Sequence, residues 1–121
     1  EAEAKKLLHC CGSLVPCDPG NILTNQGDVS YTYNILLSGK LKSMTFIKPE
    51  KEYTVPGQPF GANGLTEHNK HLEDIATIDS LEILILSGLA FQRFCHTNPE
   101  IAHKVIRRMR SMTKPPKTVT K

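Results

Sequence analysis

Residues 31–47 read YTYNILLSGKLKSMTFI, two largely apolar stretches on either side of Ser38-Gly39. Alternate side chains of a strand point to opposite faces, so one face would carry Tyr31, Tyr33, Ile35 and Leu37. A glycine between two such stretches is typical of a tight turn. The segment therefore predicts two strands joined by a short connection.

The same pattern extends on both sides of this segment. Short apolar stretches alternate with clusters of Gly, Pro, Asn and Asp, at the spacing of about 8–12 residues that is typical of barrels and sandwiches rather than βαβ units. The strands we expect cover residues 14–15, 22–23, 31–37, 41–47, 53–55, 74–78 and 81–86.

Helical patterns flank the predicted strands. We expect residues 2–11 to form a short helix that Gly12 ends, and Ser87 to be the N-cap of a helix through about Cys95. Asn98-Pro99-Glu100 then supplies a cap, an N1 proline and an early acid for a second helix. Its apolar stripe contains Ile101, Val105, Ile106, Met109 and Met112.

Length and charge are those of one small domain. The chain has 121 residues, 39% of them apolar, and a net charge of +3. Residues 1–103 hold eight Lys/Arg and twelve Asp/Glu, a net of −4, whereas residues 104–121 hold seven Lys/Arg and no acid, a net of +7. We expect a domain over 1–112 and a basic disordered tail or linker over 113–121. Contact of this tail with nucleic acid or anionic lipid is the less favoured interpretation.

The four cysteines, Cys10, Cys11, Cys17 and Cys95, have no C-x-x-C spacing. Free thiols in a reducing, cytoplasmic compartment are the favoured interpretation, and a metal site at the first three lacks the usual zinc spacing. The longest purely apolar run covers only residues 83–86, so no membrane span is expected. The opening 1–4 segment fits either a leftover secretion spacer or the first turn of a helix.

The order of helix, about eight strands and two helices resembles the cyclic-nucleotide-binding domain family of kinase regulatory subunits, channels, exchange factors and catabolite-activator-type regulators. The resemblance covers roughly residues 4–112 and rests on Pro19-Gly20-Asn21-Ile22-Leu23, Gln26-Gly27-Asp28, residues 33–41, Pro59-Phe60-Gly61, Ala76-Thr77-Ile78, residues 84–87, Phe91 and Asn98-Pro99-Glu100. It implies a mainly β fold, a jelly-roll-like double-stranded β-helix with a short N-terminal helix and two C-terminal helices.

The resemblance also implies a ligand pocket at the phosphate-binding cassette, made of Phe60, Gly61, Ala62, Asn63, Gly64, Leu65, Asp74, Ile75, Ala76 and Thr77. In ligand-binding members, backbone N–H groups and an Arg hold the cyclic phosphate, and a Glu holds the ribose. Here Ala62 replaces the Glu and Asp74 replaces the Arg. Loss of a charged hydrogen bond costs about 1.5–3 kcal/mol, so we expect that cyclic AMP and cyclic GMP do not bind in the usual way.

Three interpretations of the pocket stay open. It is empty and filled by its own side chains, or it binds a neutral or cationic ligand through Asp74. Alternatively, backbone N–H groups near Gly61, Asn63 and Gly64 hold a phosphate weakly. The expected small-molecule partner, if the pocket binds one, is a cyclic nucleotide or another small ligand. No metal or other cofactor is expected.

Two further groups of residues carry predictions. In the family, the last helix closes over the ligand and passes the signal to a neighbouring domain. We expect Ile101 and Val105 to pack on the roll, and Met109 and Met112 to contact a partner. His68 and His71 are interpreted as part of an exposed polar loop rather than as metal ligands with Glu67 or Glu73.

These patterns favour a regulatory sensor or interaction domain within a larger cytoplasmic signalling protein, with other domains or subunits as partners. No Ser/His/Asp, Cys/His or paired-carboxylate arrangement indicates an enzyme. One alternative is a functioning nucleotide-binding allosteric domain of a kinase, channel or exchange factor. Another is the effector domain of a transcription regulator, although no helix-turn-helix follows residue 112.

Overall fold

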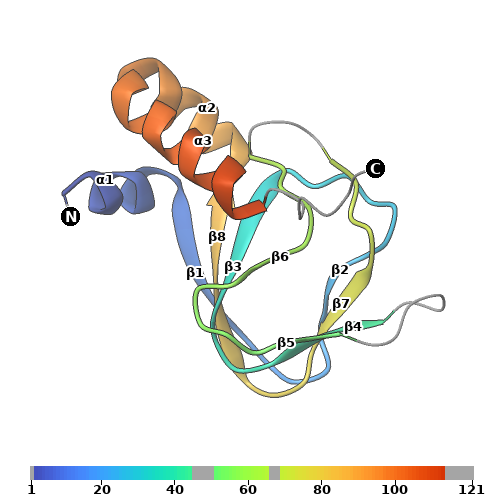
Figure 1. Ribbon diagram of the computed structural model, residues 1–121. Helices are drawn as coiled ribbons and strands as arrows, with labels where there is room; N and C mark the ends of the chain where they lie inside the picture. Colours follow the sequence, from blue (N-terminus) through green and yellow to red (C-terminus); the bar gives the residue numbers. More distant parts are fainter. Residues whose placement is uncertain (1, 45–50, 66–68, 114–121) are drawn as a thin grey trace.

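Two antiparallel four-stranded sheets form the body of the molecule (Figure 1). The computed structural model describes residues 2–44, 51–65 and 69–113. One sheet has the order β1-β8-β3-β6 and the other the order β2-β7-β4-β5. The strands are β1 (Gly12–Cys17), β2 (Ile22–Thr24), β3 (Thr32–Ser38), β4 (Leu41–Met44), β5 (Glu52–Tyr53), β6 (Pro59–Phe60), β7 (Asp74–Thr77) and β8 (Leu81–Ser87).

Three helices, α1 (Ala2–Cys11), α2 (Gly88–Thr97) and α3 (Pro99–Thr113), lie beside β1, β8 and β3, away from the second sheet (Figure 1). Both predicted helix starts are confirmed. The Ser87 side chain accepts a hydrogen bond from the Ala90 N–H at 3.2 Å, and Pro99 is the first residue of α3. The predicted mainly β fold with one N-terminal and two C-terminal helices is thus the observed one.

The first sheet buries side chains on both of its faces. Tyr33 and Leu86 belong to a core cluster beneath the helices, together with Phe91. Leu36 and Ile83, from the same two strands, belong to a second cluster inside the roll. Because helices cover the outer face of the sheet, the alternation in β3 separates two apolar environments rather than core from solvent.

Some predicted boundaries differ from the observed ones. The strand β6 was not expected, since two residues give no periodic signal. The strand predicted over 41–47 is described only as far as Met44, and the rest of it lies outside the described residues. Helix α3 extends one residue into the predicted tail, whose remaining residues, 114–121, also lie outside the description.

Met109 corrects the prediction of a partner surface on α3. Its side chain is only 5% exposed and belongs to the cluster beneath the helices. Ile101 and Val105 pack against that same cluster, as expected. The side chain of Met112 is outside the described part of the chain. The apolar stripe of α3 therefore packs against the protein's own core at least as far as Met109.

The turn between β3 and β4 depends on Gly39. This residue has a φ of +91°, a conformation that favours glycine. A Cβ at this position would overlap the Cβ of Leu81 and lie 2.9 Å from Asp79 Oδ1. The predicted connection at Ser38-Gly39 is therefore present, and it needs glycine for both its conformation and its space.

Candidate functional site

A hollow of about 740 Å³ lies beside the cassette segment. Its walls come from β5, β6 and the segments around them. Four of the sequence-predicted pocket residues, Phe60, Gly61, Ala62 and Asn63, line it. The other lining residues are Lys51, Tyr53, Gln58, Pro59, Asn69, Lys70, Leu72 and Glu73.

The remaining predicted pocket residues lie elsewhere. Asp74 is not part of the lining, and its Oδ1 accepts a hydrogen bond from the Gln26 N–H at 2.6 Å. Ile75 is fully buried in the cluster inside the roll, and Ala76 is 7% exposed. The Thr77 hydroxyl donates to the Asp18 carbonyl at 2.7 Å, so it fixes a turn. Gly64 and Leu65 are buried outside the lining.

Glu73, rather than Asp74, is the acid at the hollow. Glu73 directly precedes β7, which begins at Asp74. The Tyr53 hydroxyl donates to Glu73 Oε2 at 2.6 Å, and Lys51 Nζ lies 4.9 Å from the centre of the Tyr53 ring. Burial, together with this carboxylate, raises the pKa of Tyr53 strongly, so its hydroxyl stays a donor.

His71 corrects the interpretation of an exposed polar loop. Its side chain is only 9% exposed, and its Nδ1 accepts a hydrogen bond from the Ala62 N–H at 3.0 Å. Burial lowers the pKa of His71, although the charge of Asp28 opposes the shift. The imidazole is therefore neutral at pH 7 and holds the cassette backbone in place. His68 lies outside the described residues.

Several cassette N–H groups already have protein partners. Besides Ala62, the Gly64 N–H donates to the Thr32 carbonyl at 2.8 Å, and the Leu65 N–H donates to Asn63 Oδ1 at 2.9 Å. The Gly64 backbone also lies against Ser30, so closely that a Cβ there would overlap the Ser30 carbonyl. The arrangement is thus a tightly hydrogen-bonded loop beside an open, mixed-charge hollow.

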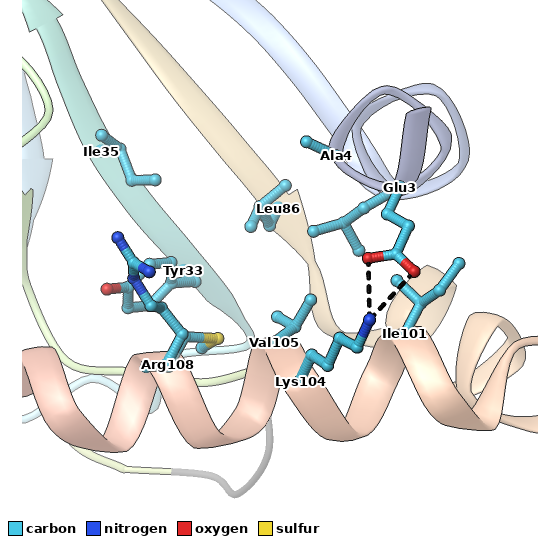
Figure 2. Close-up of a pocket in the computed structure, with 11 residues that line it drawn as sticks. Glu3, Ala4, Tyr33, Ile35, Leu86, Ile101, Lys104, Val105 and Arg108 are labelled. Carbon is cyan, nitrogen blue, oxygen red and sulfur yellow. Dashed lines mark hydrogen bonds and ion pairs between the residues drawn. The ribbon is translucent and has the colours of Figure 1, made fainter. Parts of the chain in front are cut away.

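A second hollow, a groove of about 590 Å³, lies between α1, α3 and the first sheet (Figure 2). Ile101 and Val105 line it, together with the buried Met109. No pattern in the sequence indicated this groove. The groove depends on how α1 and α3, from opposite ends of the chain, approach the sheet. An ion pair links the two helices, with Lys104 Nζ 3.2 Å from Glu3 Oε2.

The four cysteines are free thiols. Burial raises the pKa of Cys11, Cys17 and Cys95, which makes these thiols poorer nucleophiles. The described residues contain no group of three His, Cys, Asp or Glu side chains suited to a metal ion. Within residues 2–44, 51–65 and 69–113, no helix is both long and apolar enough to cross a membrane.

Comparison with known proteins gives matches among solved structures, whereas no protein-family model and no curated protein matches the sequence. The N-terminal domain of a transcriptional regulator from Streptomyces coelicolor superposes with a TM-score of 0.73 at 18% identity, covering 100% of this chain and 91% of that one. A cyclic nucleotide-binding domain from Methylobacillus flagellatus gives 0.79 at 16% identity, covering 92% and 64%.

The catabolite activator protein from Thermus thermophilus gives a TM-score of 0.66 at 20% identity, covering 91% of this chain and 55% of that chain. The fold of this chain is therefore that of cyclic-nucleotide-binding domains, as the resemblance of its turns and helix caps implied.

Proposed function

We propose that this chain is a regulatory sensor or interaction domain that does not bind cyclic AMP or cyclic GMP in the usual way. The observation that carries the proposal is the internal use of cassette N–H groups. Those of Ala62, Gly64 and Leu65 donate to a histidine nitrogen, a carbonyl and an amide oxygen. A phosphate would have to displace these acceptors, and each acceptor left unpaired in a buried place costs free energy.

The side chains at the hollow support the same conclusion. Ala62 has no carboxylate to offer a ribose hydroxyl. Glu73 adds a negative charge to the lining, and this charge opposes the binding of a phosphate there. Lys51 and Lys70 also line the hollow, but a lysine is a flexible point charge and lacks the planar fork by which arginine holds phosphate.

The regulatory context is the second part of the proposal. The structural neighbours include a transcriptional regulator and a catabolite activator, which suggests a domain that acts on adjoining domains or subunits of a larger cytoplasmic signalling protein. In this role the chain is a binding module rather than an enzyme. Fold alone does not fix function, so the ligand test below decides whether the hollow is a nucleotide sensor.

Calorimetric titration with cyclic AMP and cyclic GMP tests the proposal. The unaltered chain is expected to give no binding in the micromolar range. The double variant Ala62→Glu with Glu73→Arg supplies both missing charges at the hollow and is expected to gain at least about tenfold in affinity.

The matched control is Ala62→Glu with Asp74→Arg. Its new arginine replaces a side chain that lies outside the lining, so it is expected to gain less. Circular dichroism verifies that each variant is folded. Micromolar or tighter binding by the unaltered chain would overturn the proposal and favour a functioning nucleotide sensor.

A further inference from the structure

The groove between α1, α3 and the first sheet combines an apolar floor with a charged rim (Figure 2). The floor and walls are apolar side chains from β3, β8 and both helices, among them Leu7, Ile35, Leu86, Ile101 and Val105. Its volume of about 590 Å³ lies within the range of about 300–1,000 Å³ that is usual for small-molecule sites. The groove is separate from the hollow at the cassette.

One polar atom in the groove wall lacks a partner. Tyr33 lines the groove and is only 5% exposed, and its buried hydroxyl forms no hydrogen bond with the residues that the structure describes. Burial raises the pKa of Tyr33, so the hydroxyl is a proton donor at neutral pH. A buried hydroxyl without a partner is costly, and a ligand that offers an acceptor would remove that cost.

The charges at the groove favour an anion. Its lining contains one acid, Glu3, and two cations, Lys104 and Arg108. Glu3 and Lys104 pair with each other at 3.2 Å, which leaves the charge of Arg108 uncompensated within the lining. In Figure 2, Arg108 and Tyr33 occupy one end of the groove, and the Glu3–Lys104 pair occupies the other.

We propose that this groove binds a small amphipathic carboxylate, with its aliphatic chain on the apolar floor and its carboxylate held by Tyr33 and Arg108. The planar guanidinium of arginine matches a carboxylate, and the phenol adds a third donor. The apolar body is needed because exposed charge pairs alone contribute little. This inference concerns a different site from the cassette and does not rest on the proposed function.

Methyl NMR of the full chain, titrated with octanoate below its micelle concentration, tests the site. We expect saturable binding at or below about 1 mM, with shifts at the methyl groups of Ile101, Val105 and Leu86. Methyl groups of Leu41 and Ile75, inside the roll, are expected to stay in place. Octanol, which has the chain without the charge, is expected to bind about tenfold more weakly.

Three variants distinguish the proposed contacts from nonspecific hydrophobic binding. Arg108→Gln and Tyr33→Phe are each expected to weaken octanoate binding about tenfold while changing octanol binding little. Arg107→Gln removes an exposed neighbouring charge outside the groove lining and is expected to leave binding unchanged. The proposal is overturned if octanoate does not saturate, if shifts centre on the cassette hollow, or if Arg108→Gln and Arg107→Gln behave alike.

Discussion

Two buried tyrosines of this domain differ in one hydrogen bond. The Tyr53 hydroxyl donates to Glu73, whereas the Tyr33 hydroxyl has no partner among the described residues. Both rings are nearly fully buried, at 6% and 5% exposure. Replacing each tyrosine with phenylalanine keeps the ring and removes the hydroxyl. The two variants therefore compare the loss of a hydrogen-bonded hydroxyl with the loss of one that has no partner among the described residues.

Tyr33→Phe is expected to raise the free energy of unfolding by about 1 kcal/mol, because it removes a buried polar group that has no partner. Tyr53→Phe is expected to lower it by about 1–2 kcal/mol, because it leaves Glu73 without its donor. Urea unfolding of the two variants beside the parent protein measures both effects. A destabilised Tyr33→Phe variant would mean that this hydroxyl has a hydrogen-bond partner in solution.

His71 predicts a pH dependence of stability. Its pKa in the folded state lies below its ordinary value of 6.5, so the unfolded chain takes up the proton at higher pH. The contribution of neutral His71 to the free energy of unfolding is complete above about pH 6.5. It is lost as the pH falls through the lower pKa of the folded state. Protonation also ends the acceptance of the Ala62 N–H by Nδ1.

Unfolding measured in urea between pH 7.5 and 5 checks this expectation. His71→Gln is expected to flatten the slope in that range, whereas His103→Gln, at an exposed position of α3, is expected to retain it. Equal slopes for the parent protein and the His71 variant would contradict the assignment.

At the scale of elements, the turn that carries the chain from β3 in one sheet to β4 in the other depends on a glycine for two reasons. Gly39 and Gly20 have similar conformations, with φ of +91° and +83°. A Cβ at Gly39 would overlap Leu81, whereas nothing lies within 4 Å of a Cβ at Gly20. The pair therefore separates conformational strain from lack of space.

Gly20→Ala is expected to cost about 1–2 kcal/mol, the cost of a left-handed conformation for alanine. Gly39→Ala is expected to cost about 1–3 kcal/mol more, because the overlap forces the β3–β4 turn away from Leu81. Thermal unfolding of both variants measures the difference. Equal losses of unfolding free energy in the two variants would show that the β3–β4 turn can move away from Leu81 without cost.

Local signals predicted the elements well, because their causes lie within a few residues. Ser87 marks a helix start by its side-chain acceptor, Pro99 marks one by its fixed φ, and Gly39 marks a turn by its positive φ. The site was predicted less well. Glu73 rather than Asp74 lines the hollow, and a strand pattern could not show this because Glu73 lies in the bend just before β7.

The burial of His71 and Met109 was missed for a different reason. Both depend on segments distant in sequence: His71 contacts Ala62 and the turn at Gly27, and Met109 belongs to a cluster with Leu7 and Tyr33. A polar loop and a helical stripe look the same in sequence whether or not another element covers them. Residues 60–63 lie together along the hollow, in one continuous segment, and their role as a ligand pocket stays a prediction.

At the scale of the whole molecule, α3 belongs to the core that joins the helices to the roll. Met109→Ala is expected to lower the free energy of unfolding by about 2–5 kcal/mol, as for other buried large-to-small changes. Arg107→Ala, on the exposed side of the same helix, is expected to change it by less than about 0.5 kcal/mol. Chemical unfolding of both variants distinguishes this from a partner surface, for which Met109→Ala would leave stability unchanged.

The pairing of β8 has a consequence for the order of folding. Along its length β8 binds β3 on one side and β1 on the other, with Gly12 opposite Leu86 and Cys17 opposite Leu81. β1 is an edge strand, so β8 is its partner in the sheet. Pairings between distant parts of a chain form slowly, since a long loop must close first. During synthesis, β1 therefore cannot pair until β8 has been made. The sheet beneath the helices is completed only after nearly the whole roll has been synthesised.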